Sequence, residues 1–587
     1  MLYLNEVITA GREKTEPLLK LFCLSFSKKG EKLVPEELIN KTIGDVLDET
    51  AEKYPDNDAL VYVDRGLRYS YREFKEKCDQ LAKGLMKLGV KKGDHVAIWA
   101  YNVPEWVLLQ FATAKIGAVL VTVNIYYKAH ELEYVLKQSD TTTLFLVQGF
   151  KDVNYVDTIY KVVPELKDCA PGELKCEKLP YLKNVVFIGE EKHPGMFTFN
   201  EVMEMGNKVS DEELKERQAS LDPQDVINMQ YTSGTTGFPK GVMLTHYNIV
   251  NNAYWVGKYQ GMSPKDRLCI PVPFFHCFGC VMGTLASVVH GVTMVPVEIF
   301  DAGKVLEAVD KEKCTILYGV PTMFVRELNH PDFDKYDLSS LRTGIMAGAP
   351  CPIEVMKRVM EDMHAKEMTI AYGLTEASPV ITMTSRDDPI EKRVETVGKP
   401  MPYIEVKIVE PGTLKEVPPN TPGELVARGY NIMKGYYKMP EATAKAIENG
   451  WLHTKDLAKM DEDGYVYILG RVDDMIIRGG ENVYPREIEE FLYTHPKIKE
   501  VQVVGVPHPE YGEEVAAFIQ LKDGETATEE EIKEFCKKNI ARYKVPKYIF
   551  FTNEWPMTAS GKIQKFKLRE IAKKLLEERK KKEEVVS

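Results

Sequence analysis

The sequence predicts an α/β protein whose parallel sheets are flanked by helices, and three observations support this prediction. The chain has 587 residues. A single hydrophobic core stops growing near about 250–300 residues, so we expect several packed units. Apolar residues make up 44% and charged residues 28% of the chain, as in folded globular domains and unlike disordered or fibrous chains. Amphipathic helical segments also alternate with short apolar runs, which is typical of buried parallel strands.

The alternation can be followed element by element. The first clear unit is a helix at Leu81–Leu88, a glycine-containing turn and an apolar strand at His95–Ala100. A second helix and strand are expected at Trp106–Ala114 and Ala118–Val123. Comparable units recur at Val305–Leu317, Pro352–Met360 and Met368–Tyr372. The segment Cys169–His193 is rich in Pro, Gly, Lys and Glu, which predicts a surface excursion.

After about Gly398 the pattern changes to short alternating strands separated by turn residues, which predicts a small β-barrel-like part. Its expected strands are Tyr403–Val409, Gly423–Arg428 and Val466–Ile468. A small C-terminal α/β domain should follow, with elements at Arg486–Leu492, Ile498–Val506, Val515–Leu521 and Glu529–Asn539. An amphipathic tail begins after Lys565 and ends in mixed charges, as a solvated helix end would.

Charge and cysteine content narrow the function classes. With 77 Lys and Arg against 88 Asp and Glu, the net charge is −11. Nucleic acid is therefore not expected as a partner, whereas a small anionic ligand held by a few local cations remains compatible. Ten scattered cysteines predict reduced thiols in a cytoplasmic protein. The segment Met1–Glu13 lacks the basic and apolar regions of a signal peptide.

One apolar stretch raises the question of a membrane span. Leu268–Val297 contains no Asp, Glu, Lys or Arg, over a length that could cross a bilayer. Its prolines, glycines and histidines instead favour buried elements, with an apolar helix near Val281–Val289 and a strand near Val292–Val297. We therefore expect no transmembrane segment, and His276 at the end of an element. Cys277 and Cys280 could form half a zinc site, but no second pair follows at suitable spacing, so two buried thiols are favoured.

The strongest local motif is Tyr231–Gly241, with the sequence YTSGTTGFPKG. Its glycines let backbone N–H groups approach an anion closely, its hydroxyls donate further hydrogen bonds, and its lysine adds a positive charge. It is not a Walker A loop, in which the lysine follows a glycine and precedes Ser or Thr. We therefore expect a phosphate-binding loop of another kind, whose candidate ligands are Thr232, Ser233, Gly234, Thr235, Thr236, Gly237 and Lys240.

This motif resembles the signature of the acyl-adenylate-forming superfamily, which includes acyl-CoA synthetases, adenylation domains and luciferases. Four further segments resemble the family in the same order: YGLTE at Tyr372–Glu376, WLHTKD at Trp451–Asp456, GRVDD at Gly470–Asp474 and PMTASGK at Pro556–Lys562. The resemblance covers roughly Thr42 to Lys565. It implies that ATP and Mg²⁺ are used to activate a carboxylic acid as an acyl-adenylate. CoA then takes up the acyl group and AMP is released.

The resemblance also implies a role for each motif. Attack of a carboxylate on the α-phosphate builds charge on phosphate oxygens, so the site needs placed cations and donors rather than a nucleophile. The Thr232–Lys240 loop would hold the β- and γ-phosphates, Thr375 would donate to the α-phosphate, and Glu376 would bind Mg²⁺. Lys562 is implied as the central catalytic group, which bridges the carboxylate and the α-phosphate.

The nucleoside part of the site is implied in the same way. Asp456 matches the family's ribose aspartate, whose carboxylate accepts from both hydroxyls at once, and Arg471 would hold ribose and phosphate. The family usually has a glycine where Lys455 stands, which puts the tightness of that turn in doubt. Tyr372 is the expected stacking face for adenine. The segments that wall the adenine are implied at Gly348, Ala349, Pro350, Ala371 and Tyr372, and Gly373 is implied as a further ATP-binding residue.

In the family, the small domain rotates after the adenylate forms. The resemblance therefore implies an AMP-binding body at residues 1–472, a mobile C-terminal domain at residues 473–587 and a hinge at Asp473. Rotation would withdraw Lys562 and bring in Gly479 and Gly480, whose lack of side chains suits the wall of a narrow tunnel for the CoA thiol arm.

The acyl pocket is implied between His276, Phe278, Gly319, Ala347 and Gly373. Acetyl-CoA synthetases carry a tryptophan at the position of Gly373, so the glycine predicts open space and an acid larger than acetate. Aromatic neighbours favour a medium-chain fatty acid, with aromatic, cyclic or branched acids as alternatives. Two other hypotheses are an adenylation enzyme that loads a carrier protein and a membrane-associated lipid-binding protein. The sequence does not fix the oligomeric state, for which a homodimer is the expectation.

Overall fold

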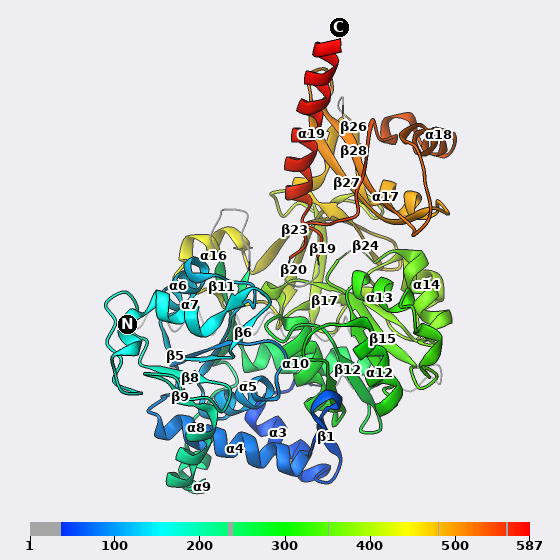
Figure 1. Cartoon of the computed structure of the whole chain (residues 1–587). Coiled ribbons are helices and arrows are strands. Elements are labelled where there is room, and N and C mark those ends of the chain that lie inside the picture. Colours follow the sequence, from blue (N-terminus) through cyan, green and yellow to red (C-terminus); the bar gives the residue numbers. More distant parts are fainter. Residues whose placement is uncertain (1–36, 233–238, 350, 479–480, 559–561, 587) are drawn as a thin grey trace, which may run out of the picture.

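The computed structural model of this chain describes residues 37–232, 239–349, 351–478, 481–558 and 562–586. The chain forms a large body and a smaller C-terminal domain that stands on one end of the body (Figure 1). Two large sheets with flanking helices make up most of the body. The predicted α/β fold class is therefore confirmed.

The first large sheet has eight strands in the order β21-β11-β10-β4-β3-β5-β8-β9. Its central strands pair in parallel, as the apolar runs predicted, and β11 and β21 are antiparallel to their neighbours. The predicted first helix is α4 (Tyr71–Lys87), which begins earlier than expected because Ser70 and Glu73 form a capping box. The strands are β3 (His95–Trp99), β4 (Val119–Thr122), β5 (Thr141–Leu146), β8 (Asn184–Phe187), β9 (Phe197–Thr198), β10 (Val226–Thr232), β11 (Lys240–Thr245) and β21 (Gly435–Tyr436), and neighbouring helices are α5 (Pro104–Ile116) and α6 (Ala129–Gln138).

The prediction that Cys169–His193 is a surface excursion is wrong in part. This segment contains β8, all four of whose residues are buried, and β8 lies between β5 and β9 in the sheet. The polar residues on either side of the short apolar run Val185–Phe187 dominate the composition of the segment, so its overall composition does not reveal the run. A four-residue strand buried on both faces gives no alternation that would reveal it.

The second large sheet has nine strands in the order β18-β17-β16-β15-β14-β12-β13-β1-β2. Strands β12, β14, β15 and β16 run parallel, so their carboxyl ends meet at one edge, where open α/β sheets bind ligands. The strands are β1 (Asp58–Tyr62), β2 (Leu67–Ser70), β12 (Arg267–Ile270), β13 (Thr293–Pro296), β14 (Ile316–Gly319), β15 (Thr343–Ala347), β16 (Thr369–Gly373), β17 (Val380–Met383) and β18 (Lys399–Pro400), and nearby helices are α10 (His246–Gln260), α12 (Ala302–Glu312), α13 (Pro321–Leu328) and α14 (Ile353–Asp362).

The uncharged stretch Leu268–Val297 forms buried elements of this second sheet. Strand β12 leads into the π-helix η4 (Phe278–Leu285), which continues as α11 (Ala286–His290) and then β13. The single apolar helix predicted near Val281–Val289 is thus a π-helix followed by a short α-helix. No helix among the described residues is long and apolar enough to cross a membrane. Cys277 and Cys280 are buried free thiols, and the Gln230 amide donates to Cys280 Sγ at 3.1 Å.

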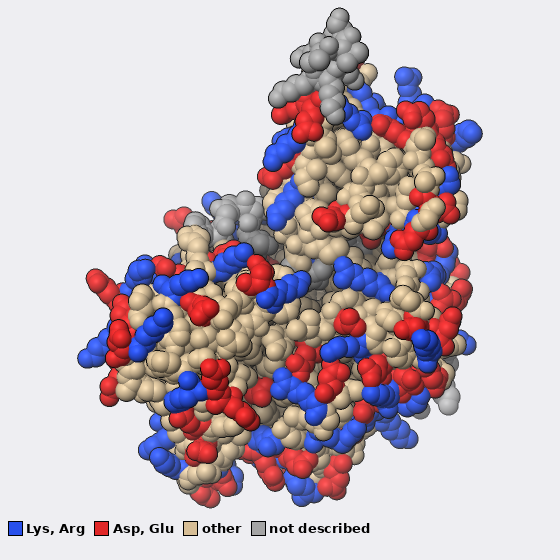
Figure 2. Space-filling model, viewed as in Figure 1, with Lys and Arg blue, Asp and Glu red and all other residues tan. Residues whose placement is uncertain are grey.

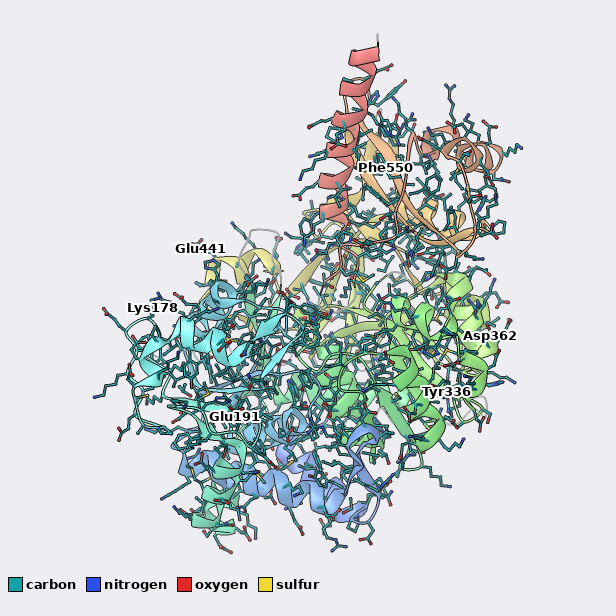
Figure 3. All side chains as sticks on the ribbon, in the orientation of Figure 1. Lys178, Glu191, Tyr336, Asp362, Glu441 and Phe550 are labelled. Carbon is teal, nitrogen blue, oxygen red and sulfur yellow. The ribbon has the colours of Figure 1, made fainter. Side chains whose placement is uncertain are left out.

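The predicted barrel-like part is a small antiparallel sheet in which β19 (Ile404–Val409), β20 (Gly423–Gly429), β23 (Trp451–Met460) and β24 (Val466–Arg471) pair in sequence. The C-terminal domain has a sheet of its own with hydrophobic cores that begin at Ile476. Phe550, labelled in Figure 3, belongs to the core that packs against the last helix. The elements of this domain are β25 (Ile476–Arg478), β26 (Glu481–Val483), α17 (Pro485–Tyr493), β27 (Ile498–His508), β28 (Gly512–Leu521), α18 (Glu529–Asn539), β29 (Tyr548–Phe551) and α19 (Lys565–Val586).

Charges on the molecular surface are mixed. Figure 2 shows acidic and basic side chains interspersed over the visible face of both the body and the C-terminal domain. A surface of mixed sign offers no extended cationic track for a nucleic-acid backbone, in keeping with the net charge of −11.

A buried carboxyl group in the body should make stability depend on pH. Glu327 of α13 is completely buried, and within the described residues neither carboxyl oxygen has a hydrogen-bond partner. Burial raises the pKa of Glu327 from 4.5 to about 8, because an ionised carboxylate loses its hydration there. The folded protein therefore keeps this proton between pH 4.5 and pH 8, whereas the unfolded chain loses it.

We expect this group to lower the free energy of unfolding by about 1.4 kcal/mol for each pH unit within that window. The isosteric variant Glu327→Gln cannot ionise, so its melting temperature should lie close to that of the wild type near pH 5 and above it near pH 8. Thermal melts of both proteins at several pH values measure the difference. Parallel curves for the two proteins would show that Glu327 does not titrate in this way.

Candidate active site

The phosphate-binding motif joins two paired strands. Strand β10 ends at Thr232 and β11 begins at Lys240, and these two residues are register partners. Pro239 is supported from α6, where the Tyr134 hydroxyl donates to its carbonyl oxygen at 3.0 Å. The structure thus places both stems of the predicted loop at the end of one hairpin. The predicted ligands Ser233, Gly234, Thr235, Thr236 and Gly237 lie outside the described residues.

The predicted metal ligand Glu376 is held by a tyrosine that sequence reasoning missed, and Lys240 lies over the ring of that tyrosine. Thr375 and Glu376 begin the short helix η6 (Thr375–Ala377) directly after β16. The Tyr436 hydroxyl donates to Glu376 Oε1 at 2.8 Å, and Lys240 Nζ lies 4.9 Å from the centre of the Tyr436 ring. Tyr436 reaches this place because β21 pairs with β11. No periodicity or motif in the sequence predicts that long-range pairing.

Glu376 fits the role of a Mg²⁺ ligand. It is a half-buried carboxylate, and among the described residues Tyr436 donates to one of its two oxygens, Oε1. Mg²⁺ in proteins is commonly bound by one or two carboxylates together with phosphate oxygens of the substrate. Glu376 would therefore hold the ion at the end of the phosphate-binding hairpin.

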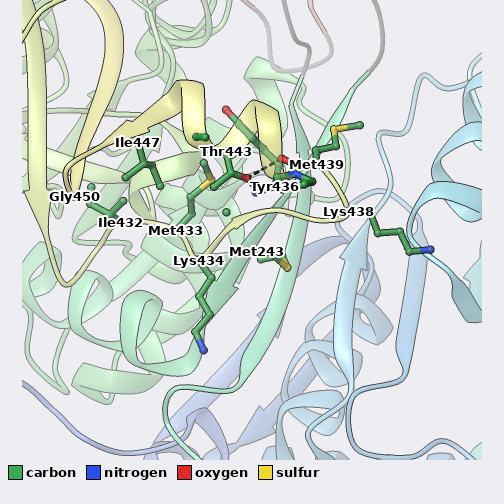
Figure 4. A pocket seen from close by; sticks show the side chains of 13 residues that line it. Met243, Ile432, Met433, Lys434, Tyr436, Lys438, Met439, Thr443, Ile447 and Gly450 are labelled. Carbon is green, nitrogen blue, oxygen red and sulfur yellow. Dashed lines mark hydrogen bonds between the residues drawn. The ribbon is translucent and has the colours of Figure 1, made fainter. Parts of the chain in front are cut away.

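An open apolar groove of about 690 Å³ adjoins this cluster (Figure 4). Tyr436 forms part of its wall, and the Tyr436 amide is held by the Thr443 hydroxyl at 2.9 Å. The side chains in Figure 4 that give the groove its apolar character are Met243, Ile432, Met433, Met439 and Ile447.

The predicted ribose ligand Asp456 is buried and held from two sides. Its Oδ2 accepts from the Tyr372 hydroxyl at 2.7 Å, and its Oδ1 accepts from Arg471 Nη1 at 2.8 Å. Arg471 is the register partner of Asp456 on β24. Burial raises the pKa of Asp456, and the charge of Arg471 opposes this rise. Each carboxylate oxygen has two acceptor positions, so the pair can still accept ribose hydroxyls.

Lys455 occupies a left-handed conformation directly before Asp456. Its φ is +60°, a region that favours glycine and costs other residues about 1–2 kcal/mol. The Lys455 amide donates to Glu424 Oε1 at 3.1 Å, which holds the irregular turn within β23. The turn that was in doubt is therefore formed, although the residue is not glycine.

Lys562 reaches the body from the C-terminal domain. A Cβ built on Gly348 would lie 3.3 Å from Lys562 Cε and 3.9 Å from Nζ, and the Gly348 φ of +87° also requires glycine. The Lys562 residue is exposed overall, yet its ammonium end lies among groups of the body. The pKa of Lys562 is lowered, first by the loss of solvent around the ammonium and then by Arg471, while Asp456 opposes the shift.

Local hydrogen bonds explain why Lys562 is presented in this way. The Thr558 amide donates to the Lys562 carbonyl at 2.7 Å, and the Lys562 amide donates to Thr558 Oγ1 at 3.0 Å. Thr558 and Lys562 both lie between β29 and α19. On the body side, the pKa of His276 falls to about 3, through burial and then through the positive charge of Lys562. His276 is thus a neutral residue just before η4, as predicted for the end of an element.

The predicted acyl-pocket residues lie at the carboxyl ends of neighbouring strands. Gly319, Ala347 and Gly373 end β14, β15 and β16, and the Phe278 ring centre lies 5.5 Å from that of Tyr318. Gly319 leaves room for an aromatic ring, since a Cβ there would lie 2.8 Å from Phe324. Ala371 of β16 is buried beside these strand ends.

The inference of open space beside Gly373 is wrong. A Cβ built on Gly373 would lie 1.8 Å from the carbonyl oxygen of Pro379, because β16 turns back into the antiparallel β17 at this point. A tryptophan here would require the backbone to move. Gly373 itself is exposed, so it can line a site with its backbone, but its missing side chain does not leave a free space in the direction of Cβ.

The remaining predicted residues concern the domain connection. Asp473 lies in the short helix η7 (Val472–Asp474), between β24 of the body and β25 of the C-terminal domain. Gly479 and Gly480 lie outside the described residues; their chain neighbours Arg478 and Glu481 are register partners of β25 and β26. Ala349 follows Gly348 at the edge of β15, and Pro350 lies outside the described residues.

Comparison with known proteins points to one family. The family model described as AMP-binding enzyme matches residues 47–437, and the one described as AMP-binding enzyme C-terminal domain matches residues 487–562. YngI of Bacillus subtilis (strain 168), which bears the name of an acyl-CoA synthetase, is 59% identical over 535 residues, 91% of this chain and 97% of that protein. The mitochondrial medium-chain acyl-CoA ligase ACSF2 of Bos taurus is 46% identical over 542 residues, 91% of this chain and 88% of that protein. Among solved structures, the anthranilate CoA ligase AuaEII in complex with anthranoyl-AMP matches with a TM-score of 0.78 at 28% identity, covering 92% of this chain and 98% of that chain.

Proposed function

This chain belongs to the AMP-binding enzyme family and is an AMP-forming acyl-CoA ligase that uses ATP, Mg²⁺ and CoA, and we propose that its acid substrate is a medium-chain fatty acid. The observation that carries this choice is the 46% identity, over nearly the whole chain, to a medium-chain acyl-CoA ligase. The aromatic side chains near His276 in the sequence, Phe274, Phe275 and Phe278, form apolar surroundings. Burial of a hydrocarbon chain in such surroundings is favourable.

The proposed first half-reaction needs the residues that the structure brings together. A carboxylate oxygen of the acid forms a bond to the α-phosphorus of ATP while pyrophosphate leaves, and negative charge builds up on the phosphate oxygens. We assign Lys562 to that charge and to the carboxylate, because its ammonium end reaches Gly348 from the other domain. Asp456 and Arg471 would fix the ribose, which holds the α-phosphate in place.

Glu376 and Lys240 would act on the leaving pyrophosphate side, and Thr375 would donate its hydroxyl to the α-phosphate. Mg²⁺ bound at Glu376 would neutralise part of the charge on the β- and γ-phosphates. The Tyr436 hydroxyl orients the Glu376 carboxylate, and partners of this kind commonly fix metal-binding side chains. Lys240, whose Nζ lies 4.9 Å from the centre of the Tyr436 ring, would add a second positive charge.

We propose the boundary between the two domains at Asp473. The hydrophobic core of the body extends to Val466, with Ile468 packed against it, and the core of the C-terminal domain begins at Ile476. The two cores are therefore joined by a short connection around η7. This arrangement supports a C-terminal domain that can rotate, so that Lys562 serves the first half-reaction and Gly479 and Gly480 serve attack of the CoA sulfur on the acyl carbon.

A panel of acids tests the proposed substrate. Acetate, octanoate, palmitate, benzoate and anthranilate are supplied with ATP, Mg²⁺ and CoA, and pyrophosphate release is measured. Each buried methylene contributes about 0.8 kcal/mol, so octanoate should exceed acetate in kcat/KM by at least about a hundredfold. Octanoate should also exceed both aromatic acids.

Two other results would change the assignment. A preference for benzoate or anthranilate would favour the aromatic alternative. Pyrophosphate release that proceeds without any CoA-dependent release of AMP would favour an adenylation enzyme that loads a carrier protein. A cytoplasmic location and a homodimer remain proposals; the nine described cysteines are all free thiols, which supports a reducing compartment.

A further inference from the structure

Helix α17 of the C-terminal domain makes two polar contacts across the domain boundary. The Ile353 amide of the body donates to Glu490 Oε2 at 3.4 Å. Arg486 Nη1 donates to the Ile468 carbonyl of the body at 3.2 Å. The two side chains also face each other, with Arg486 Nε and Glu490 Oε1 separated by 3.6 Å. Both are mostly buried, with exposed side-chain fractions of 14% and 24%.

Glu490 supplies what helix α14 lacks. The N-cap of α14 is Pro352, which has no side chain able to accept a hydrogen bond from the first turn. The first amides of a helix need acceptors, and its N-terminus favours a negative charge. Glu490 provides both from the other domain. Burial raises the pKa of Glu490 and the charge of Arg486 opposes the rise, as for a carboxylate enclosed between two domains.

The place of this contact connects it to the reaction. Helix α14 follows the strand end at Gly348, and Gly348 is the residue against which the Lys562 side chain lies. Glu490 and Lys562 belong to the same domain, so the contact at α14 and the approach of Lys562 occur together. A rotation that withdraws Lys562 must also break the bonds to Ile353 and Ile468.

We propose that Arg486 and Glu490 are positioning residues for adenylate formation, which hold the C-terminal domain in the arrangement that brings Lys562 to Gly348. The inference rests on the proposed function of Lys562. It assigns to these residues no contact with substrate. Their effect is on how often the domain occupies the arrangement needed for the first half-reaction.

The test compares Glu490→Ala with Glu487→Ala in the full-length protein. Glu487 lies on the same helix, is exposed, and pairs with Lys544 of its own domain, so it controls for the loss of a carboxylate from α17. In Glu490→Ala, adenylate formation, measured by ATP–pyrophosphate exchange with octanoate, should fall about tenfold. Thioester formation from supplied octanoyl-adenylate should be unchanged or faster. Glu490→Gln keeps an oxygen acceptor, so its rate of adenylate formation should lie between the rates of the wild type and Glu490→Ala.

Hydrogen exchange of the backbone gives a readout that does not depend on activity. In Glu490→Ala the amides at Ile353–Val355 should exchange several-fold faster than in the wild type, while Glu487→Ala should leave them unchanged. Equal loss in both half-reactions, or the same effect from Glu487→Ala, would overturn the proposal. If the wild-type protein shows no ATP–pyrophosphate exchange, the proposed function is refuted instead. If hydrogen exchange of the α14 amides is unchanged in Glu490→Ala, the contact between Glu490 and α14 is refuted by itself.

Discussion

Replacing Lys562 with alanine should slow adenylate formation by about 10²- to 10³-fold, the usual loss when one donor to transition-state charge is removed. The expectation follows from the position of the ammonium group, which comes from the C-terminal domain and lies against Gly348 at the edge of the body. Thioester formation from supplied acyl-adenylate should be spared, because the proposed rotation removes Lys562 before that step. Pyrophosphate release and thioester formation, measured separately, give the two rates.

Lys567 offers a matched control for this experiment. It is an exposed lysine five positions along the chain, in α19 of the same domain, and Lys567→Ala should leave both half-reactions unchanged. Loss of both half-reactions in Lys562→Ala, or of neither, would remove the assignment of Lys562. Melting curves of the variants would show whether the domain remains folded.

The fold could be predicted where a pattern is repeated and continuous. Periods of helix and apolar strand predicted β3, β4 and α5 within a few residues, and they predicted only the second half of α4. The same method missed β8, because its four residues are buried on both faces and lie within a polar segment. It also could not distinguish the π-helix η4 from an α-helix, since the sequence is apolar on every side there. Local pattern predicts elements, and their partners come from packing between distant segments.

The candidate site shows a similar division. The motifs predicted Asp456, Glu376 and Lys562, and the structure brings Asp456 next to Arg471 and Lys562 next to Gly348. Tyr436, which holds Glu376, was missed because only the pairing of β21 with β11 places it there. The Gly373 inference was wrong for a related reason. A glycine leaves free space only where no other atoms occupy the position of the missing side chain. At Gly373 the backbone at the start of β17 occupies that position.

Proline at the proposed hinge should have the opposite effect to Lys562→Ala: adenylate formation should be kept and thioester formation lost. The described turn is a 3₁₀ helix, η7, whose usual φ of about −50° to −70° is the range that proline imposes. The φ that Asp473→Pro would fix is therefore in the usual range of this turn, in the arrangement in which Lys562 meets the body. The substitution should also restrict the change in φ that a rotation of the domain requires.

Adenylate formation by Asp473→Pro should stay within about threefold of the wild type, while thioester formation falls about a hundredfold, as expected when a required domain motion is blocked. The acyl-adenylate should then accumulate on the enzyme, where acid quenching and chromatography can measure it. Asp473→Ala removes the same carboxylate but leaves φ free, so it should form thioester at a rate near that of the wild type. If the proline variant makes thioester normally, the chain does not turn at Asp473. If the alanine variant stalls as well, the carboxylate matters and the freedom of the backbone does not. The pair of variants thus distinguishes a hinge from a charged contact in the chain segment that joins the core of the body to the core that begins at Ile476.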